Sequence, residues 1–163
     1  MRIQDLSGSA SSISFLKPED INLLAPLMKE FYEEGNIQGS FNQEYAAKSV
    51  GGLLQSGTGF CLYQGRPILG AICAFVYPDF GTGDLCCNEY FWFVTKKARG
   101  GSLGMRLFKA FEEEAKRRDV KRILVGHIMT SDERDSTMKK VYESQGYKLK
   151  EQSFLKCVQP QQQ

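Results

Sequence analysis

The sequence predicts one α/β domain built on a mixed sheet, because runs typical of strands alternate with segments typical of helices. Three apolar or aromatic runs, at 59–63, 68–77 and 85–94, have the composition of β-strands. A strongly amphipathic segment follows them and predicts a long helix that begins near Leu103. No internal repeat or linker-like stretch divides the chain, so a single domain is expected.

The residues before the first run predict a short strand and two helices. The strand covers 13–16. Pro18 suits the first turn of a helix, and apolar residues then recur at helical spacing until Gly35. A second helix is expected over 43–54, although two adjacent glycines weaken its pattern.

The turn at 64–67, with the sequence Gln-Gly-Arg-Pro, predicts a hairpin between the first two runs. In the long helix, apolar residues four positions apart form one face, and three acid-before-base pairs predict a solvated opposite face. These pairs are Glu112–Lys116, Glu113–Arg117 and Glu114–Arg118. The remaining expected elements are a buried strand at 122–126, a short helix at 136–144 ending at Gly146, and a last strand or hairpin at 149–158.

The composition excludes several classes of protein. Apolar residues make up 42% and charged residues 25% of the chain, which is ordinary for a soluble globular domain. The formal net charge of +2 is too small to indicate nucleic-acid binding. No apolar stretch is long enough to cross a membrane, and the polar leader at 1–11 has no signal-peptide core, so a cytoplasmic protein is expected. With a polar tail at 159–163, the predicted domain spans 12–158.

The cysteines are expected to be reduced and to act as small buried apolar residues. None has Cys-x-x-Cys spacing, and most lie in apolar runs. A disulfide frame, a metal site or a thiol nucleophile is the alternative. The chain has one histidine, His127, so it has few ligands for a zinc site of the usual Cys/His kind, and no metal is expected. The cysteines are Cys61, Cys73, Cys86, Cys87 and Cys157.

The most informative segment is the basic, glycine-rich turn that joins the third run to the long helix. The first N–H groups of a helix lack intrahelical partners and carry partial positive charge, and glycines let an oxyanion approach them closely. Lys96, Lys97 and Arg99 add positive charge to this turn. The segment therefore predicts a cradle for a pyrophosphate, with a tight turn that binds nothing as the alternative. It is neither a Walker loop nor a Gly-x-Gly-x-x-Gly fingerprint.

Two spaced motifs resemble those of the GNAT acetyltransferase superfamily. Arg99, Gly100 and Gly104 match motif A of that family, and Ser102 stands where its middle glycine usually does. Downstream, Tyr142-Glu-Ser-Gln-Gly-Tyr147 matches the family's Tyr-x-x-x-Gly-Phe/Tyr signature. The resemblance covers residues 60–157 and implies one GNAT-like domain with a mixed, mostly antiparallel sheet flanked by about four helices.

The resemblance also implies an acyl donor, acetyl-CoA, and roles for particular residues. The strand end at Phe93 and Val94 would pair with the pantetheine arm. Tyr142 would protonate the departing thiolate, although its alternative is a core tyrosine on a helix face. The backbone amides of the turn would hold the pyrophosphate, namely those of Arg99, Gly100, Gly101, Ser102, Leu103 and Gly104.

A base is needed as well, because an ammonium cannot attack a thioester. Glu89 is the best candidate, since a carboxylate within an apolar strand is costly unless it has a function or a partner. Strand alternation puts Glu89 on one face with Cys87, Phe91 and Phe93. The alternative is a strand-end residue that points to water. Two nearby acids are reserve candidates, Asp79 and Asp84.

The functional hypothesis is an N-acetyltransferase that moves an acetyl group directly from acetyl-CoA to an amine. The alternative is a non-catalytic module that binds or senses acyl-CoA. The acceptor stays open among a protein lysine or N-terminus, a polyamine, an aminoglycoside and another small amine, and a homodimer is compatible with the sequence. Several aromatic residues could line the acceptor pocket, although aromatic strands usually belong to the core: Tyr77, Phe80, Tyr90 and Trp92.

Overall fold

A computed structural model provides the structure of this protein. It describes residues 12–35, 37, 39–127, 132–151 and 153–156. The expected leader at 1–11 and tail at 159–163 lie outside the described residues. The chain divides into two compact units, 1–128 and 129–163. None of the described helices is both long and apolar enough to span a membrane.

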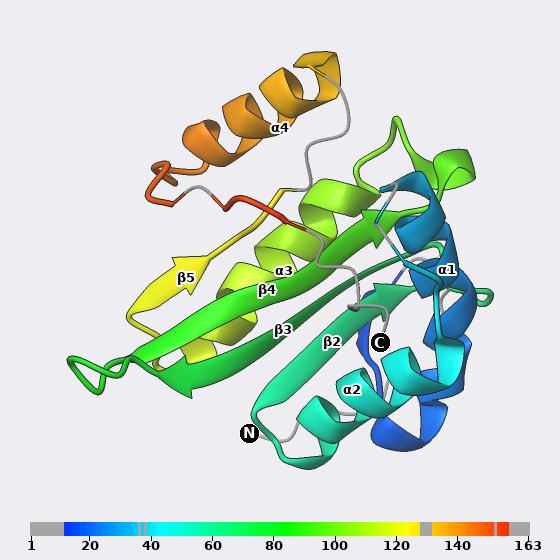
Figure 1. Cartoon of the computed structure of the whole chain (residues 1–163), viewed down its shortest axis with the longest axis horizontal. Coiled ribbons are helices and arrows are strands. Elements are labelled where there is room, and N and C mark those ends of the chain that lie inside the picture. The colour runs from blue at the N-terminus through cyan, green and yellow to red at the C-terminus, as the bar shows by residue number, and fades with distance from the viewer. Residues whose placement is uncertain (1–11, 36, 38, 128–131, 152, 157–163) are drawn as a thin grey trace, which may run out of the picture. The chain divides into compact units, whose positions relative to one another are not determined.

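The first unit is built on a five-stranded sheet in which the strands follow one another in chain order (Figure 1). The first four strands pair antiparallel, and the fifth pairs parallel with the fourth. The predicted mixed, mostly antiparallel sheet is therefore confirmed. The strands are β1 (Ser14–Phe15), β2 (Gly59–Gln64), β3 (Gly70–Pro78), β4 (Leu85–Val94) and β5 (Arg122–Leu124).

The helices lie close to their predicted positions. The first begins as a 3₁₀ turn over Pro18–Leu24 and becomes α-helical only from Ala25, because Pro26 has no N–H to donate to the preceding turn. In the next helix, Asn42 is the N-cap, and its side-chain oxygen accepts a hydrogen bond of 2.9 Å from the Tyr45 amide. The α-helices are α1 (Ala25–Glu34), α2 (Gln43–Gln55), α3 (Leu103–Arg117) and α4 (Asp132–Ser144).

Opposite faces of β4 contact different helices. Phe31 of α1 packs on Phe91 and Phe93, with ring centroids 5.6 and 5.7 Å apart. Trp92, between them, packs on Phe108 of α3 at 4.8 Å. The sheet therefore has α1 on one face and α3 on the other, and both layers contribute buried aromatic rings.

A β-bulge in β4 corrects the predicted alternation. Cys73 of β3 lies opposite Phe91, and the next residue, Ala74, lies opposite Glu89, so Tyr90 is an extra residue. The strand changes face at this point. Cys87 lies on the α3 face, because charges at the end of α3 affect the pKa of its thiol. Phe91 lies on the α1 face. The expectation that Cys87 and Phe91 both share a face with Glu89 is wrong. Strict alternation holds only in a ladder without a bulge.

Glu114 is a second correction, since it was expected on a solvated face. Its side chain is buried, and its two oxygens accept hydrogen bonds of 2.6 to 2.7 Å from Arg117 and Arg118. Arg118 also donates to the Gly57 carbonyl and stacks over Phe60. A buried carboxylate needs such partners, and this ion cluster fastens the C-terminal end of α3 to the sheet.

The expectation of five reduced cysteines is also wrong. Cys61 and Cys73 are directly opposite each other in the β2–β3 hairpin and form a disulfide. Their separation of 12 residues does not by itself predict a disulfide. The two cysteines become neighbours only in the register of the two strands, which the sequence did not reveal. Cys86 and Cys87 are free and buried, as predicted, and Cys157 lies outside the described residues.

The predicted last strand at 149–158 is absent from the described residues of that segment, 149–151 and 153–156. Leu149, Phe154 and Leu155 are largely exposed there. An apolar run becomes a strand only when an edge of a sheet is available to pair with it, and no such pairing occurs among the described residues.

Candidate active site

The glycine-rich turn presents a series of backbone donors at the positive end of α3. The first intrahelical bond runs from the Arg106 amide to the Ser102 carbonyl, at 2.9 Å. Within the described part of the chain, the amides of 100–104 have no acceptor. Gly100 has a φ of +84°, which only glycine adopts without strain, and this conformation turns the chain into the helix. Consecutive N–H groups at a helix N-terminus make a site suited to an anion.

Packing within the protein does not require glycine at most positions of this turn. A Cβ atom on Gly101 would meet nothing within 4 Å. On Gly104 it would only touch Trp92 and Val94 at ordinary distances of 3.6 and 3.8 Å. The space beside these glycines is therefore open from the protein side, as a cradle for a diphosphate requires.

Arg99 holds the turn in place rather than pointing its charge away from the protein. Its Nε donates to the Val94 carbonyl at 2.8 Å, and its two Nη atoms donate to Glu34 of α1 at 2.7 and 2.9 Å. Its guanidinium lies 4.9 Å from the centre of the Phe93 ring. The Arg99 amide is also bonded, to the Lys96 carbonyl at 3.3 Å. The donors left for a ligand therefore begin at Gly100.

The open edge of β4 begins at Glu89. The parallel pairing of β4 with β5 ends where Asn88 meets Leu124, so β5 accompanies only the first part of β4 (Figure 1). The Glu89 carboxylate accepts a hydrogen bond of 3.2 Å from the Gly126 amide, just beyond β5. Burial raises the pKa of Glu89 to about 7, and the Gly126 hydrogen bond opposes this rise. Near neutral pH this carboxyl can accept a proton.

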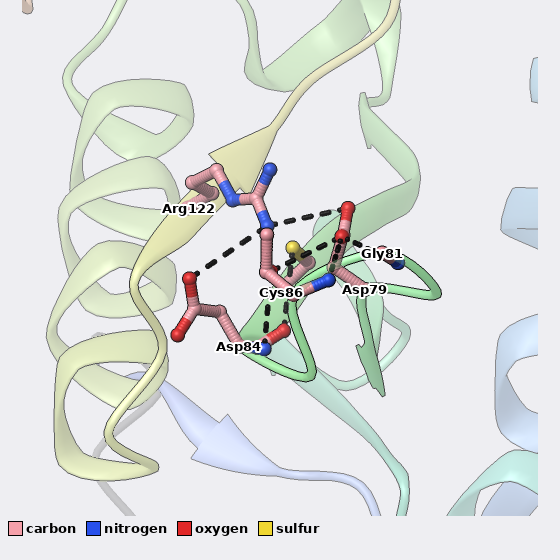
Figure 2. A network of polar contacts seen from close by, with 6 residues as sticks. Asp79, Gly81, Asp84, Cys86 and Arg122 are labelled. Carbon is pink, nitrogen blue, oxygen red and sulfur yellow. Dashed lines mark hydrogen bonds and ion pairs between the residues drawn. The ribbon is translucent and has the colours of Figure 1, made fainter.

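The reserve acids, Asp79 and Asp84, close the β3–β4 hairpin (Figure 2). Asp79 accepts hydrogen bonds of 3.0 and 2.9 Å from the Gly81 and Thr82 amides, and these bonds lower its pKa. Arg122 of β5 lies 3.2 Å from Asp79 and 4.0 Å from Asp84. This network lies at the start of β4, whereas the glycine-rich turn follows its end, and its contacts fix β5 to the hairpin.

Tyr142 belongs to the second unit, where its signature forms a helix C-terminus. Gly146 has a φ of +88°, and its amide donates to the Glu143 carbonyl at 3.0 Å. The Tyr147 amide reaches back to the Tyr142 carbonyl at 3.1 Å, and the two tyrosine rings lie 6.1 Å apart. This is a Schellman motif with its usual apolar contact, so the spacing of Tyr142, Gly146 and Tyr147 has a structural cause.

A cavity of about 360 Å³ lies between α1, α2 and the part of β4 that follows Glu89. Of the aromatic residues considered from the sequence, Tyr90 lines it, whereas Trp92 packs on α3 and Phe80 is exposed in the hairpin turn. Most of the wall was not evident from the sequence, because aromatic residues on α1, α2 and their connection resemble ordinary core positions. The aromatic lining consists of Phe31, Tyr32, Phe41, Tyr45, Tyr90 and Phe91.

The thiol of Cys87 is expected to be unreactive. Burial raises its pKa to about 12, so almost no thiolate forms near neutral pH. Incubation of the native protein with acetyl-CoA should therefore leave Cys87 unacetylated in peptide mass spectra, while the same protein unfolded in denaturant should react with iodoacetamide at this residue. An acetyl-cysteine trapped at Cys87, or ping-pong kinetics, would contradict direct transfer.

No group of three or more His, Cys, Asp or Glu side chains suited to a metal occurs among the described residues. No curated protein matches the chain in sequence. Several solved structures match its fold. An aminoglycoside acetyltransferase from an uncultured soil metagenomic sample is 21% identical, with a TM-score of 0.70 over 91% of this chain and 98% of the other.

Two further matches have the same fold at lower identity. Ribosomal-protein-alanine N-acetyltransferase from Brucella melitensis biovar Abortus is 17% identical, with a TM-score of 0.67 over 91% of this chain and 99% of the other. A predicted acetyltransferase with acetyl-CoA, from Clostridium acetobutylicum, is 15% identical, with a TM-score of 0.70 over 90% of this chain and 95% of the other. The acetyltransferase (GNAT) family matches residues 22–147, most of the chain. This protein therefore belongs to the GNAT acetyltransferase family.

Proposed function

We propose that this enzyme moves an acetyl group from acetyl-CoA directly to an amine, which forms an amide and releases coenzyme A. The observation that carries the proposal is the set of amides at 100–104, which have no acceptor within the described chain and lie at the positive end of α3. These amides suit the pyrophosphate of coenzyme A. Acetyl-CoA supplies the acetyl thioester.

The strand end before the cradle suits the pantetheine arm. The Thr95 amide donates to the Leu69 carbonyl of the β3 side at 2.9 Å. Since bonding direction alternates along an antiparallel ladder, the Phe93 peptide groups are directed to β3 and those of Val94 to the open edge. Of the two predicted residues, Val94 is therefore the one we assign to pairing with an amide of the cofactor.

Glu89 is the proposed base. Its carboxyl has a pKa near the working pH, which suits a group that must take a proton from an ammonium and release it again. It does not line the cavity, but it directly precedes Tyr90 and Phe91, which do. The first proton passes to Glu89 directly or through a water molecule. The amine nitrogen then forms its bond to the acetyl carbon as the bond to sulfur breaks, and it loses its second proton to water.

Tyr142 is the proposed acid, which protonates the departing sulfur. The support for this role is the resemblance of its signature to that of the family, since the helix C-terminus explains the glycine and Tyr147 but requires no hydroxyl at residue 142. A Schellman motif asks only for an apolar contact at that position.

The cradle can be tested with Gly104→Val. A Cβ at residue 104 makes ordinary contacts with Trp92 and Val94, and we expect the bulk of the valine to crowd the proposed diphosphate site, so coenzyme A affinity should fall on the order of tenfold or more by calorimetry. The control is Gly52→Val on α2, where a Cβ meets nothing within 4 Å. Unchanged affinity in Gly104→Val would exclude this placement of the pyrophosphate.

Turnover distinguishes the enzyme from a module that only binds acyl-CoA. The enzyme should release coenzyme A thiol from acetyl-CoA when an amine is added, and mass spectrometry should find the acetylated amine. Coenzyme A binding without thiol release for any amine would favour the sensing module instead.

A further inference from the structure

The cavity beside β4 has a wall without charge. Its described lining residues include aromatic, aliphatic, amide and hydroxyl side chains and no Asp, Glu, Lys, Arg or His. The connection between α1 and α2, residues 35–42, also contains no acidic residue in the sequence. An amine in this cavity therefore meets no carboxylate among the described lining residues.

Two pairs of packed aromatic rings belong to the wall of the cavity. Tyr32 and Phe41 pack with ring centroids 5.6 Å apart, and Phe31 packs on Phe91 at the same distance. Tyr90, the bulged residue of β4, adds a half-exposed ring. Ring faces attract a single cation, and they bury apolar groups away from water.

We propose that the acceptor is a small monoamine carried on an aryl or branched alkyl group, and that this cavity binds the apolar group. The inference rests on the proposed function and names its substrate class. A polyamine or aminoglycoside would bring several ammonium groups, and each one that lost water without a carboxylate partner would weaken binding. The volume of about 360 Å³ lies at the lower end of the range of small-molecule pockets, about 300–1,000 Å³, and suits one ring with a short side chain.

The polar lining residues do not change this assignment. Ser40, Asn42 and Ser49 can donate or accept single hydrogen bonds. The Asn42 side-chain oxygen already accepts from the Tyr45 amide, so this residue mainly caps α2. Such groups can bind one hydroxyl group on the acceptor, but not the many hydroxyl groups of a sugar.

The test compares four amines at equal concentration: phenylethylamine, isoamylamine, spermidine and kanamycin. Calorimetry in the presence of coenzyme A measures amine binding, and thiol release from acetyl-CoA measures turnover. We expect phenylethylamine and isoamylamine to bind and to react with kcat/KM at least about tenfold above spermidine and kanamycin. Each methylene removed from the alkyl chain should lower kcat/KM about fourfold, since a buried methylene is worth about 0.8 kcal/mol.

Two variants assign the effect to this cavity. Phe41→Ala removes one wall and should lower kcat/KM for phenylethylamine about tenfold or more, whereas Phe80→Ala, in the exposed hairpin turn, should not. Ser49→Asp places a carboxylate in the wall and should raise kcat/KM for spermidine relative to that for phenylethylamine. Ser49→Asn is the uncharged control of similar shape.

The outcomes separate the two proposals. Binding and acetylation of spermidine or kanamycin in preference to the monoamines would overturn the acceptor class while leaving the acetyltransferase proposal intact. Failure of coenzyme A to bind would overturn the proposed function. Monoamine turnover that is insensitive to Phe41→Ala and Ser49→Asp, or the absence of monoamine binding in the coenzyme A complex, would overturn the assignment of this cavity.

Discussion

Glu89→Gln is expected to lower kcat/KM for the amine on the order of a hundred- to ten-thousand-fold, the usual effect of removing a positioned base. The wild-type rate should rise with pH through about 7, because the Glu89 carboxyl loses its proton there. The variant should lack this rise, so its deficit is greatest above pH 7. Glutamine is a suitable replacement, since its side-chain oxygen can still accept from the Gly126 amide.

The same substitution should stabilise the protein above pH 7. The native pKa of Glu89, about 7, lies above its ordinary value of 4.5, so the stability associated with the protonated carboxyl is full below pH 4.5 and is lost as the pH rises through 7. Removing this cost should raise the free energy of unfolding at pH 8 by at most about 3 kcal/mol, at about 1.4 kcal/mol per pKa unit. Full turnover in Glu89→Gln, or an unchanged pH profile, would remove Glu89 from the mechanism.

Tyr142→Phe is expected to lower turnover about a hundredfold or more with little change in coenzyme A affinity. The substitution removes only the hydroxyl, and the phenyl ring can still pack on Tyr147 at the end of α4. The free energy of unfolding should therefore change by less than about 0.5 kcal/mol.

Tyr147→Phe is the matched control, because it removes the hydroxyl of the neighbouring ring in the same motif. Steady-state kinetics with thiol detection should find its turnover close to that of the wild type. Equal losses in both variants, or no loss in Tyr142→Phe, would mean that the signature serves the helix end alone.

Local patterns in the sequence were sufficient for most of the fold. The β4 strand occupies the predicted residues, and α3 begins at Leu103, because each carries its own periodic pattern and end signals. What failed depended on pairing between distant segments. The Cys61–Cys73 disulfide requires the hairpin register, the Tyr90 bulge requires the ladder with β3, and a strand among the described residues of 149–158 would have required a partner.

The candidate site followed the same division. The row of backbone donors before α3 was predictable because the glycines of the turn and the start of the helix are consecutive in the chain. The ion pair between Arg99 and Glu34 could not be predicted, since the two residues are 65 positions apart. The uncharged wall of the cavity was also hidden, because it combines α1, α2 and β4, and no pattern within one element reveals what three elements enclose.

Helix α1 has two edges with different neighbours. Glu34 holds Arg99, and Glu30 accepts a hydrogen bond of 3.2 Å from the Lys96 amide, so one edge is fastened to the turn before α3. Phe31 and Tyr32, on the same ten-residue helix, form part of the cavity wall. If a ligand in the cavity shifts α1 and so changes the affinity of the turn for its own ligand, the ligand of the turn must change the affinity of the cavity by the same factor.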